Sequence, residues 1–98
     1  MRSISIFGAT GSIGESTFDL IRRAGGAQAF RTVALTGARN VTRLAEMARE
    51  LRAEVAVVAH EEELPALREA LAGSGVEAAA GAAAIADAAD RPRSEDHK

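Results

Sequence analysis

Three glycines at three-residue spacing follow the first apolar segment of the chain. The segment that contains them reads Gly8-Ala9-Thr10-Gly11-Ser12-Ile13-Gly14. In this pattern Gly8 permits a tight turn, Gly11 leaves the backbone open to a phosphate, and Gly14 lets a helix pack closely on a strand. Backbone N–H groups at the helix start, with the hydroxyls of Thr10 and Ser12, would donate to a pyrophosphate. The spacing is a variant of the G-x-G-x-x-G fingerprint and predicts a dinucleotide site; the alternative is a turn that serves packing alone.

A second candidate segment follows the next strand-like run and reads Gly37-Ala38-Arg39-Asn40. Domains that bind NAD usually carry Asp or Glu here, about 20 residues beyond the glycines, to hold the ribose hydroxyls. This segment has no carboxylate and has a cation at Arg39, which suits the 2′-phosphate and favours NADPH over NAD. The alternative is that Arg39 is only a solvated loop residue and Asn40 only a helix cap.

Strand and helix patterns alternate along the chain and place both segments in turns between a strand and a helix. Strands are expected at residues 3–7, 30–36, 54–59 and, more weakly, 76–79, because these runs are β-branched or continuously apolar. Helices are expected from Ile13, from Val41 with Asn40 as the cap, over 61–71 with Pro65 in an early turn, and over 81–89. This alternation predicts an α/β fold, a Rossmann-like doubly wound parallel sheet of about four βα units.

The 98 residues are expected to form one incomplete, NADPH-binding domain over 1–89, followed by a disordered polar tail over 90–98. Aromatic residues make up only 3% and alanines are abundant, so the core should be lightly packed.

Several classes of function are disfavoured by composition. The net charge of −2 comes with no basic block, which argues against nucleic acid. With no cysteine there is no thiolate metal site, and no apolar run approaches the length of a membrane span. His60 precedes three glutamates, but consecutive helical residues point in different directions, so no metal site is expected there. No catalytic acid or base stands out, and the cytoplasm is the expected location.

Three segments, residues 3–23, 33–52 and 55–81, closely resemble the amino-terminal end of the 1-deoxy-D-xylulose 5-phosphate reductoisomerase family. The resemblance implies an NADPH-dependent enzyme that rearranges and reduces this phosphorylated sugar to 2-C-methyl-D-erythritol 4-phosphate in non-mevalonate isoprenoid synthesis. It also implies Mg²⁺ or Mn²⁺, with ligands outside this chain, and a homodimeric full-length enzyme.

By the same resemblance, the residues Thr10, Gly11, Ser12 and Ile13 correspond to pyrophosphate contacts. The second NADPH loop corresponds to Gly37, Ala38, Arg39 and Asn40. Since the family continues into a catalytic domain, we expect a truncated, frame-shifted or deliberately shortened chain that is inactive alone. Two alternatives remain: another NADP-dependent oxidoreductase, of the semialdehyde dehydrogenase or extended short-chain reductase type, or a stand-alone NADP-binding module.

Overall fold

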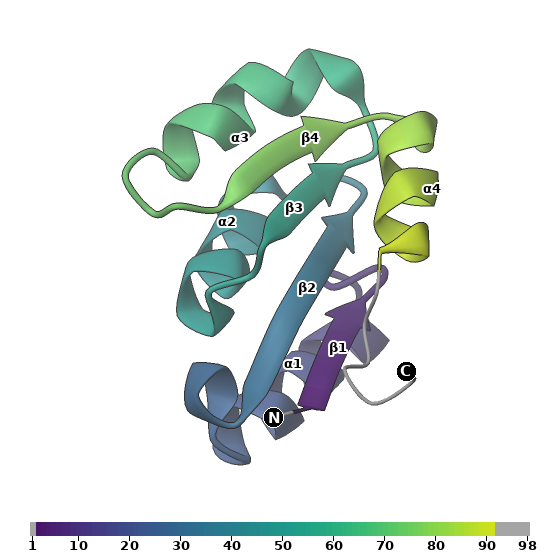
Figure 1. Cartoon of the computed structure of the whole chain (residues 1–98). Coiled ribbons are helices and arrows are strands. Elements are labelled where there is room, and N and C mark those ends of the chain that lie inside the picture. Colours follow the sequence, from purple (N-terminus) through teal and green to yellow (C-terminus); the bar gives the residue numbers. More distant parts are fainter. Residues whose placement is uncertain (1, 92–98) are drawn as a thin grey trace.

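The computed structural model describes residues 2–91, in which four strands alternate with four helices (Figure 1). The strands are β1 (Arg2–Ile6), β2 (Phe30–Gly37), β3 (Val55–Val58) and β4 (Glu77–Ala80). The helices are α1 (Ser12–Arg23), α2 (Val41–Leu51), α3 (Leu64–Ala70) and α4 (Ala82–Asp90), with short 3₁₀ turns η1 (Gly26–Gln28) and η2 (Glu61–Glu63). None of these helices is long and apolar enough to cross a membrane.

All four strands are parallel and lie in the order β1-β2-β3-β4. Each of the three crossovers therefore leads to the next strand on the same side, and right-handed crossovers then place their helices on one face. After β4 the chain turns back, and α4 packs on the opposite face (Figure 1). Helices on both faces of a parallel sheet confirm the predicted α/β, Rossmann-like, doubly wound fold.

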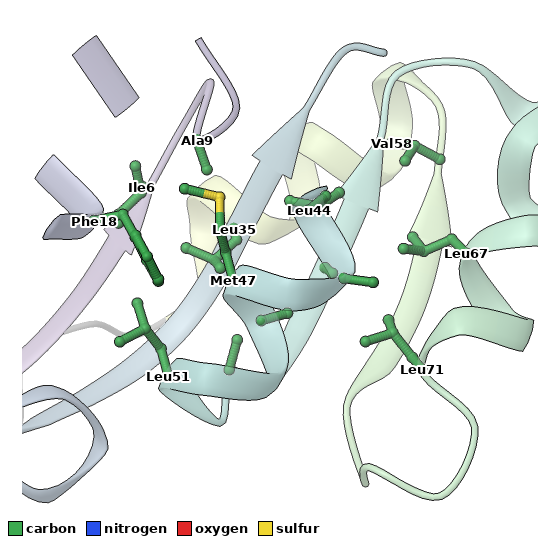
Figure 2. Packing of buried hydrophobic residues seen from close by; sticks show 14 residues of the cluster. Ile6, Ala9, Phe18, Leu35, Leu44, Met47, Leu51, Val58, Leu67 and Leu71 are labelled. Carbon is green, nitrogen blue, oxygen red and sulfur yellow. The ribbon is translucent and has the colours of Figure 1, made fainter. Parts of the chain in front are cut away.

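The larger core cluster lies under α1, α2 and α3. Phe18, Met47 and Leu67, one from each helix, meet the buried side chains of the sheet in this cluster (Figure 2). A smaller cluster joins Ala88 of α4 to Val33 and Val57. Alanines supply most of the contacts of α4, so little apolar area is buried on that face.

Local signals explain several element boundaries. The side chain of Asn40 accepts a hydrogen bond of 3.0 Å from the backbone N–H of Arg43, which makes Asn40 the N-cap of α2, as predicted. Pro65 lies in the first turn of α3, where its missing N–H costs no helical bond. The expected helix over 61–71 is divided, because its first three residues form η2.

The expected tail boundary needs a correction. Asp90 is the last residue of α4 rather than part of a tail. Arg91 follows it and lies 3.1 Å from the carboxylate of Glu77 and 3.9 Å from that of Glu54. These ion pairs hold the end of α4 to the sheet, an interaction across the fold that local polarity did not reveal. The rest of the expected tail, residues 92–98, lies outside the described residues.

Candidate cofactor-binding site

The glycine loop, residues 8–14, is held to the end of β2 by two hydrogen bonds. The N–H of Gly8 donates to the hydroxyl of Thr36 over 2.9 Å, and the N–H of Ala9 donates to the carbonyl of Thr36 over 2.7 Å. Within the loop, the N–H of Gly11 donates to the carbonyl of Gly8 over 3.1 Å. The loop is therefore fixed by its neighbour strand before any ligand binds.

The three glycines differ in whether, and why, the fold requires a residue without a side chain. Gly8 has a φ of +76°, a conformation that L side chains rarely adopt. A Cβ at Gly14 would collide with the carbonyl oxygen of Gly8 and lie 2.6 Å from the backbone of Ala9. A Cβ at Gly11 would meet only the carbonyl oxygen of Gly8, at an ordinary 3.5 Å. Folding thus requires Gly8 and Gly14, whereas the protein itself leaves room for a side chain at Gly11.

The start of α1 carries unused donor capacity. Gly11 occupies the N-cap and has no side chain, so no capping oxygen satisfies the amides of the first turn. Ser12 and Ile13 follow in that turn, and Ile13 is 82% exposed. A pocket of about 380 Å³ opens here, lined by Phe7 and Thr17 together with the glycine loop. Free amides at the positive end of a helix suit an anion such as pyrophosphate.

The second segment, residues 37–40, lies beside the glycine loop. Gly37 is buried at the end of β2, whereas the next three residues are exposed. A pocket of about 310 Å³ lies between the two loops, and its wall consists of Gly8, Thr10, Gly11, Ala38, Arg39 and Asn40. The structure therefore brings the two predicted segments, which are more than 20 residues apart in sequence, to one pocket.

The two arginines that follow β2 differ in their surroundings. Arg43 forms ion pairs with Glu15 at 2.8 Å and with Glu46 at 3.1 Å. The hydrogen bond from Arg43 holds the pKa of Glu15 below its usual range, and that same bond raises the pKa of Arg43. Among residues 2–91 Arg39 has no hydrogen bond or ion pair, so it is the cation available at this pocket.

These features fit a dinucleotide with an additional phosphate. The open helix start and the open side of Gly11 suit the pyrophosphate, and the exposed Arg39 suits a 2′-phosphate. In contrast, the described part of the chain has no group of three His, Cys, Asp or Glu side chains arranged to hold a metal ion. A further hollow of about 440 Å³ lies beside Arg49 and Arg52, but Arg49 there donates to the carbonyl of Ala70.

Two residues of this region were missed by sequence reasoning. Thr36, which anchors the glycine loop, was visible only as the last residue of a strand, directly before Gly37. Arg43 had no local signal beyond its place in the first turn of α2, because its partner Glu15 lies on another helix.

Comparison with known proteins agrees with the geometry. Residues 4–96 match the 1-deoxy-D-xylulose 5-phosphate reductoisomerase family. The reductoisomerase of Cereibacter sphaeroides is 79% identical over 94% of this chain and 23% of its own length. That of Paracoccus denitrificans is 68% identical over 94% of this chain and 24% of its own length.

Solved structures give the same result. The Zymomonas mobilis reductoisomerase in complex with NADPH has a TM-score of 0.85 and 50% identity, over 90% of this chain and 23% of that one. A reductoisomerase in complex with NADPH, fosmidomycin and magnesium has a TM-score of 0.81 and 30% identity, over 91% of this chain and 22% of that one. This chain thus spans about a quarter of the length of its relatives. On these grounds the chain belongs to the 1-deoxy-D-xylulose 5-phosphate reductoisomerase family.

Proposed function

We propose that this chain is the NADPH-holding part of a 1-deoxy-D-xylulose 5-phosphate reductoisomerase. The pocket of about 310 Å³ carries the proposal, because its wall joins the glycine loop to the loop at Ala38–Asn40. Two solved relatives that contain NADPH, and that share this fold at 30% identity or more, support the same assignment.

In this proposal each loop holds one part of the cofactor. The backbone of Gly8, Gly11 and Gly14 forms the turn and, with Thr10, Ser12 and Ile13, faces the pyrophosphate at the start of α1. The backbone of Gly37 and Ala38 lies beside the adenosine ribose, and the second loop ends at Asn40, the N-cap of α2. Arg39 binds the 2′-phosphate through a charge-assisted contact.

The preference for NADPH over NADH follows from the charges at the second loop. Residues 37–40 contain no carboxylate that would bind a free 2′-hydroxyl or repel a phosphate. Because Arg43 is occupied by two carboxylates, Arg39 is the residue that we assign to the additional phosphate.

The proposed reaction of the whole protein converts 1-deoxy-D-xylulose 5-phosphate to 2-C-methyl-D-erythritol 4-phosphate in isoprenoid synthesis. NADPH supplies the hydride when it is bound, and residues 2–91 contribute its orientation. We assign no acid, base or metal ligand to these residues, and we place the Mg²⁺ or Mn²⁺ of the reaction elsewhere in the whole protein. By itself the chain is expected to be inactive.

The proposal extends to the setting of the whole protein. We place it in the cytoplasm, as a homodimer that acts on a phosphorylated sugar and binds no nucleic acid. The near-balanced net charge of −2, without a basic block, supports the last point. Light scattering of the whole protein tests the dimer.

Calorimetric titration of the 98-residue chain with NADPH and with NADH tests the binding proposal. We expect NADPH to bind more tightly, and Gly11→Val to weaken both nucleotides, because its side chain enters the space of the pyrophosphate. Ala66→Val, at an exposed position of α3 that lines neither pocket, serves as the control, and circular dichroism verifies the fold of both variants. If Gly11→Val binds NADPH as tightly as the unsubstituted chain, the glycine loop does not hold the cofactor.

A further inference from the structure

The side chain of Arg43 connects the two helices whose first turns border the pocket. Its Nε and Nη2 atoms each lie 2.8 Å from an oxygen of Glu15, so the guanidinium and the carboxylate form a bidentate salt bridge. Glu15 directly follows Gly14 in α1, and Arg43 lies three residues after Asn40 in α2. One side-chain pair therefore joins the helix that follows the glycine loop to the helix that follows the second loop.

Further contacts fix the position of Arg43 from other sides. Its Nη1 lies 3.1 Å from Glu46, and its guanidinium carbon lies 5.1 Å from the ring centre of the buried Phe18. Its backbone N–H donates to the side chain of Asn40 over 3.0 Å. Arg43 is thus bound at its backbone to one wall of the pocket and at its guanidinium to the helix that begins at the other.

The stability of α2 alone does not explain this residue. An arginine in the first turn of a helix opposes the positive end of the helix dipole, and that turn of α2 contains no acidic residue to compensate. Of the two carboxylates that compensate it, Glu46 lies further along α2, whereas Glu15, which accepts two of the hydrogen bonds from Arg43, comes from α1. The side chains of Arg43 and Glu15 are 32% and 39% exposed, so both are partly shielded from water. In this setting a bidentate salt bridge restrains the two side chains more than it would on a fully exposed surface.

We propose that Arg43 is a positioning residue, which through Glu15 holds the glycine loop and the loop at residues 37–40 at the separation that the cofactor requires. The predicted effect on cofactor affinity rests on the proposed function, whereas the predicted effect on the rigidity of the two loops does not. Arg43 lines neither pocket beside the glycine loop, so its effect passes through the two helix starts.

Two readouts on the 98-residue chain test this proposal. The first is amide hydrogen exchange by NMR, without ligand, at the hydrogen-bonded amides of Gly11 and Glu15 at the glycine loop and of Leu44 at the second loop. Arg43→Ala should accelerate exchange in both loops, although the substitution lies in only one helix. The second is the dissociation constant for each nucleotide, which Arg43→Ala should raise about five- to tenfold for NADPH and NADH alike. Equal losses distinguish positioning from a direct phosphate contact, which would weaken NADPH alone.

Rescue separates positioning from a general loss of stability. The double substitution Glu15→Arg with Arg43→Glu, here called the exchanged pair, swaps the two charges and restores an opposite-charge pair between α1 and α2. It is made in a Glu46→Gln background, because a glutamate at position 43 would otherwise repel Glu46. We expect it to recover most of the exchange protection and affinity that Glu15→Arg alone loses. Asp19→Asn is the matched control, since it removes ion pairs confined to α1, and both readouts should remain unchanged.

The outcomes separate the two proposals. If the unsubstituted chain binds neither nucleotide, the cofactor assignment fails, while loop exchange still decides the role of Arg43. Unchanged exchange in both loops after Arg43→Ala, or an exchanged pair that behaves like Glu15→Arg alone, would overturn the positioning role.

Discussion

The side chain of Thr10 packs directly against Gly37, the last residue of β2. A Cβ atom at Gly37 would lie 3.1 Å from the hydroxyl oxygen of Thr10, 3.4 Å from its methyl group and 3.5 Å from Leu44. This contact joins the glycine loop to the second loop through the smallest residue available. The residue before it, Thr36, binds the backbone of the same loop, so the end of β2 supports both sides of the pocket.

Substitution of Gly37 tests this contact. Gly37→Ala should lower the free energy of unfolding by about 1–2 kcal/mol, because the added methyl group forces Thr10 to move. Thr10→Ala in the same chain should recover most of that loss, which a double-mutant cycle in urea measures. Strictly additive effects of the two substitutions would show that the side chains do not compete for space.

Gly14 and Gly11 should respond differently to alanine. Gly14→Ala should lower the free energy of unfolding by about 3 kcal/mol or prevent folding, because the added Cβ would collide with the backbone of Gly8 and Ala9, which cannot move aside as a flexible side chain could. Gly11→Ala should stay within about 1 kcal/mol of the unsubstituted chain, because its Cβ has an ordinary 3.5 Å contact. Thermal unfolding followed by circular dichroism compares the two, and equal midpoints would contradict the assigned packing role.

Arg39 should determine the choice of nucleotide. Arg39→Ala should weaken NADPH binding about ten- to a hundredfold, since a charge-assisted contact contributes about 1.5–3 kcal/mol. NADH lacks the 2′-phosphate and should be affected much less. Arg39→Lys should be intermediate, because it keeps the charge but not the planar fork. The ratio of the two dissociation constants is the measurement, and equal losses for both nucleotides would assign Arg39 to loop support instead.

The ion pair of Glu15 should make stability depend on pH in the acidic range. Arg43 lowers the pKa of Glu15 in the folded chain relative to the unfolded chain. The stabilisation is therefore complete above the unfolded pKa and is lost as the pH falls through the lower, folded one. As the pH is lowered from about 5 to about 3, the free energy of unfolding, measured in urea, should fall less steeply for Glu15→Gln than for the unsubstituted chain.

Asp19 provides the comparison for that measurement. Its pKa is also lowered, chiefly by the hydrogen bond from Arg22 on the same helix. Asp19→Asn should therefore reduce the acid dependence as well, and the two substitutions should add, because the pairs share no partner. A decline as steep in Glu15→Gln as in the unsubstituted chain would show that the pair with Arg43 contributes nothing in solution.

Local patterns in the sequence determined the elements and both candidate loops. Period-two and continuous apolar runs marked the strands, and Asn40 marked the start of α2, because these signals act over a few residues. The glycine spacing from Gly8 to Gly14 likewise reports backbone requirements that are local, and the family was recognisable from the same segments. The roles of these residues toward NADPH stay predictions.

Tertiary structure alone decided how the elements and loops meet. The order β1-β2-β3-β4, and the position of α4 on the opposite face, depend on which apolar faces can be buried together, which no single element specifies. The contacts of Thr10 with Gly37 and of Glu15 with Arg43 join residues 27 and 28 positions apart. Such pairs form only when parallel crossovers bring successive helix starts to the same edge of the sheet, because side-chain contacts require proximity in space, whereas sequence patterns record proximity along the chain.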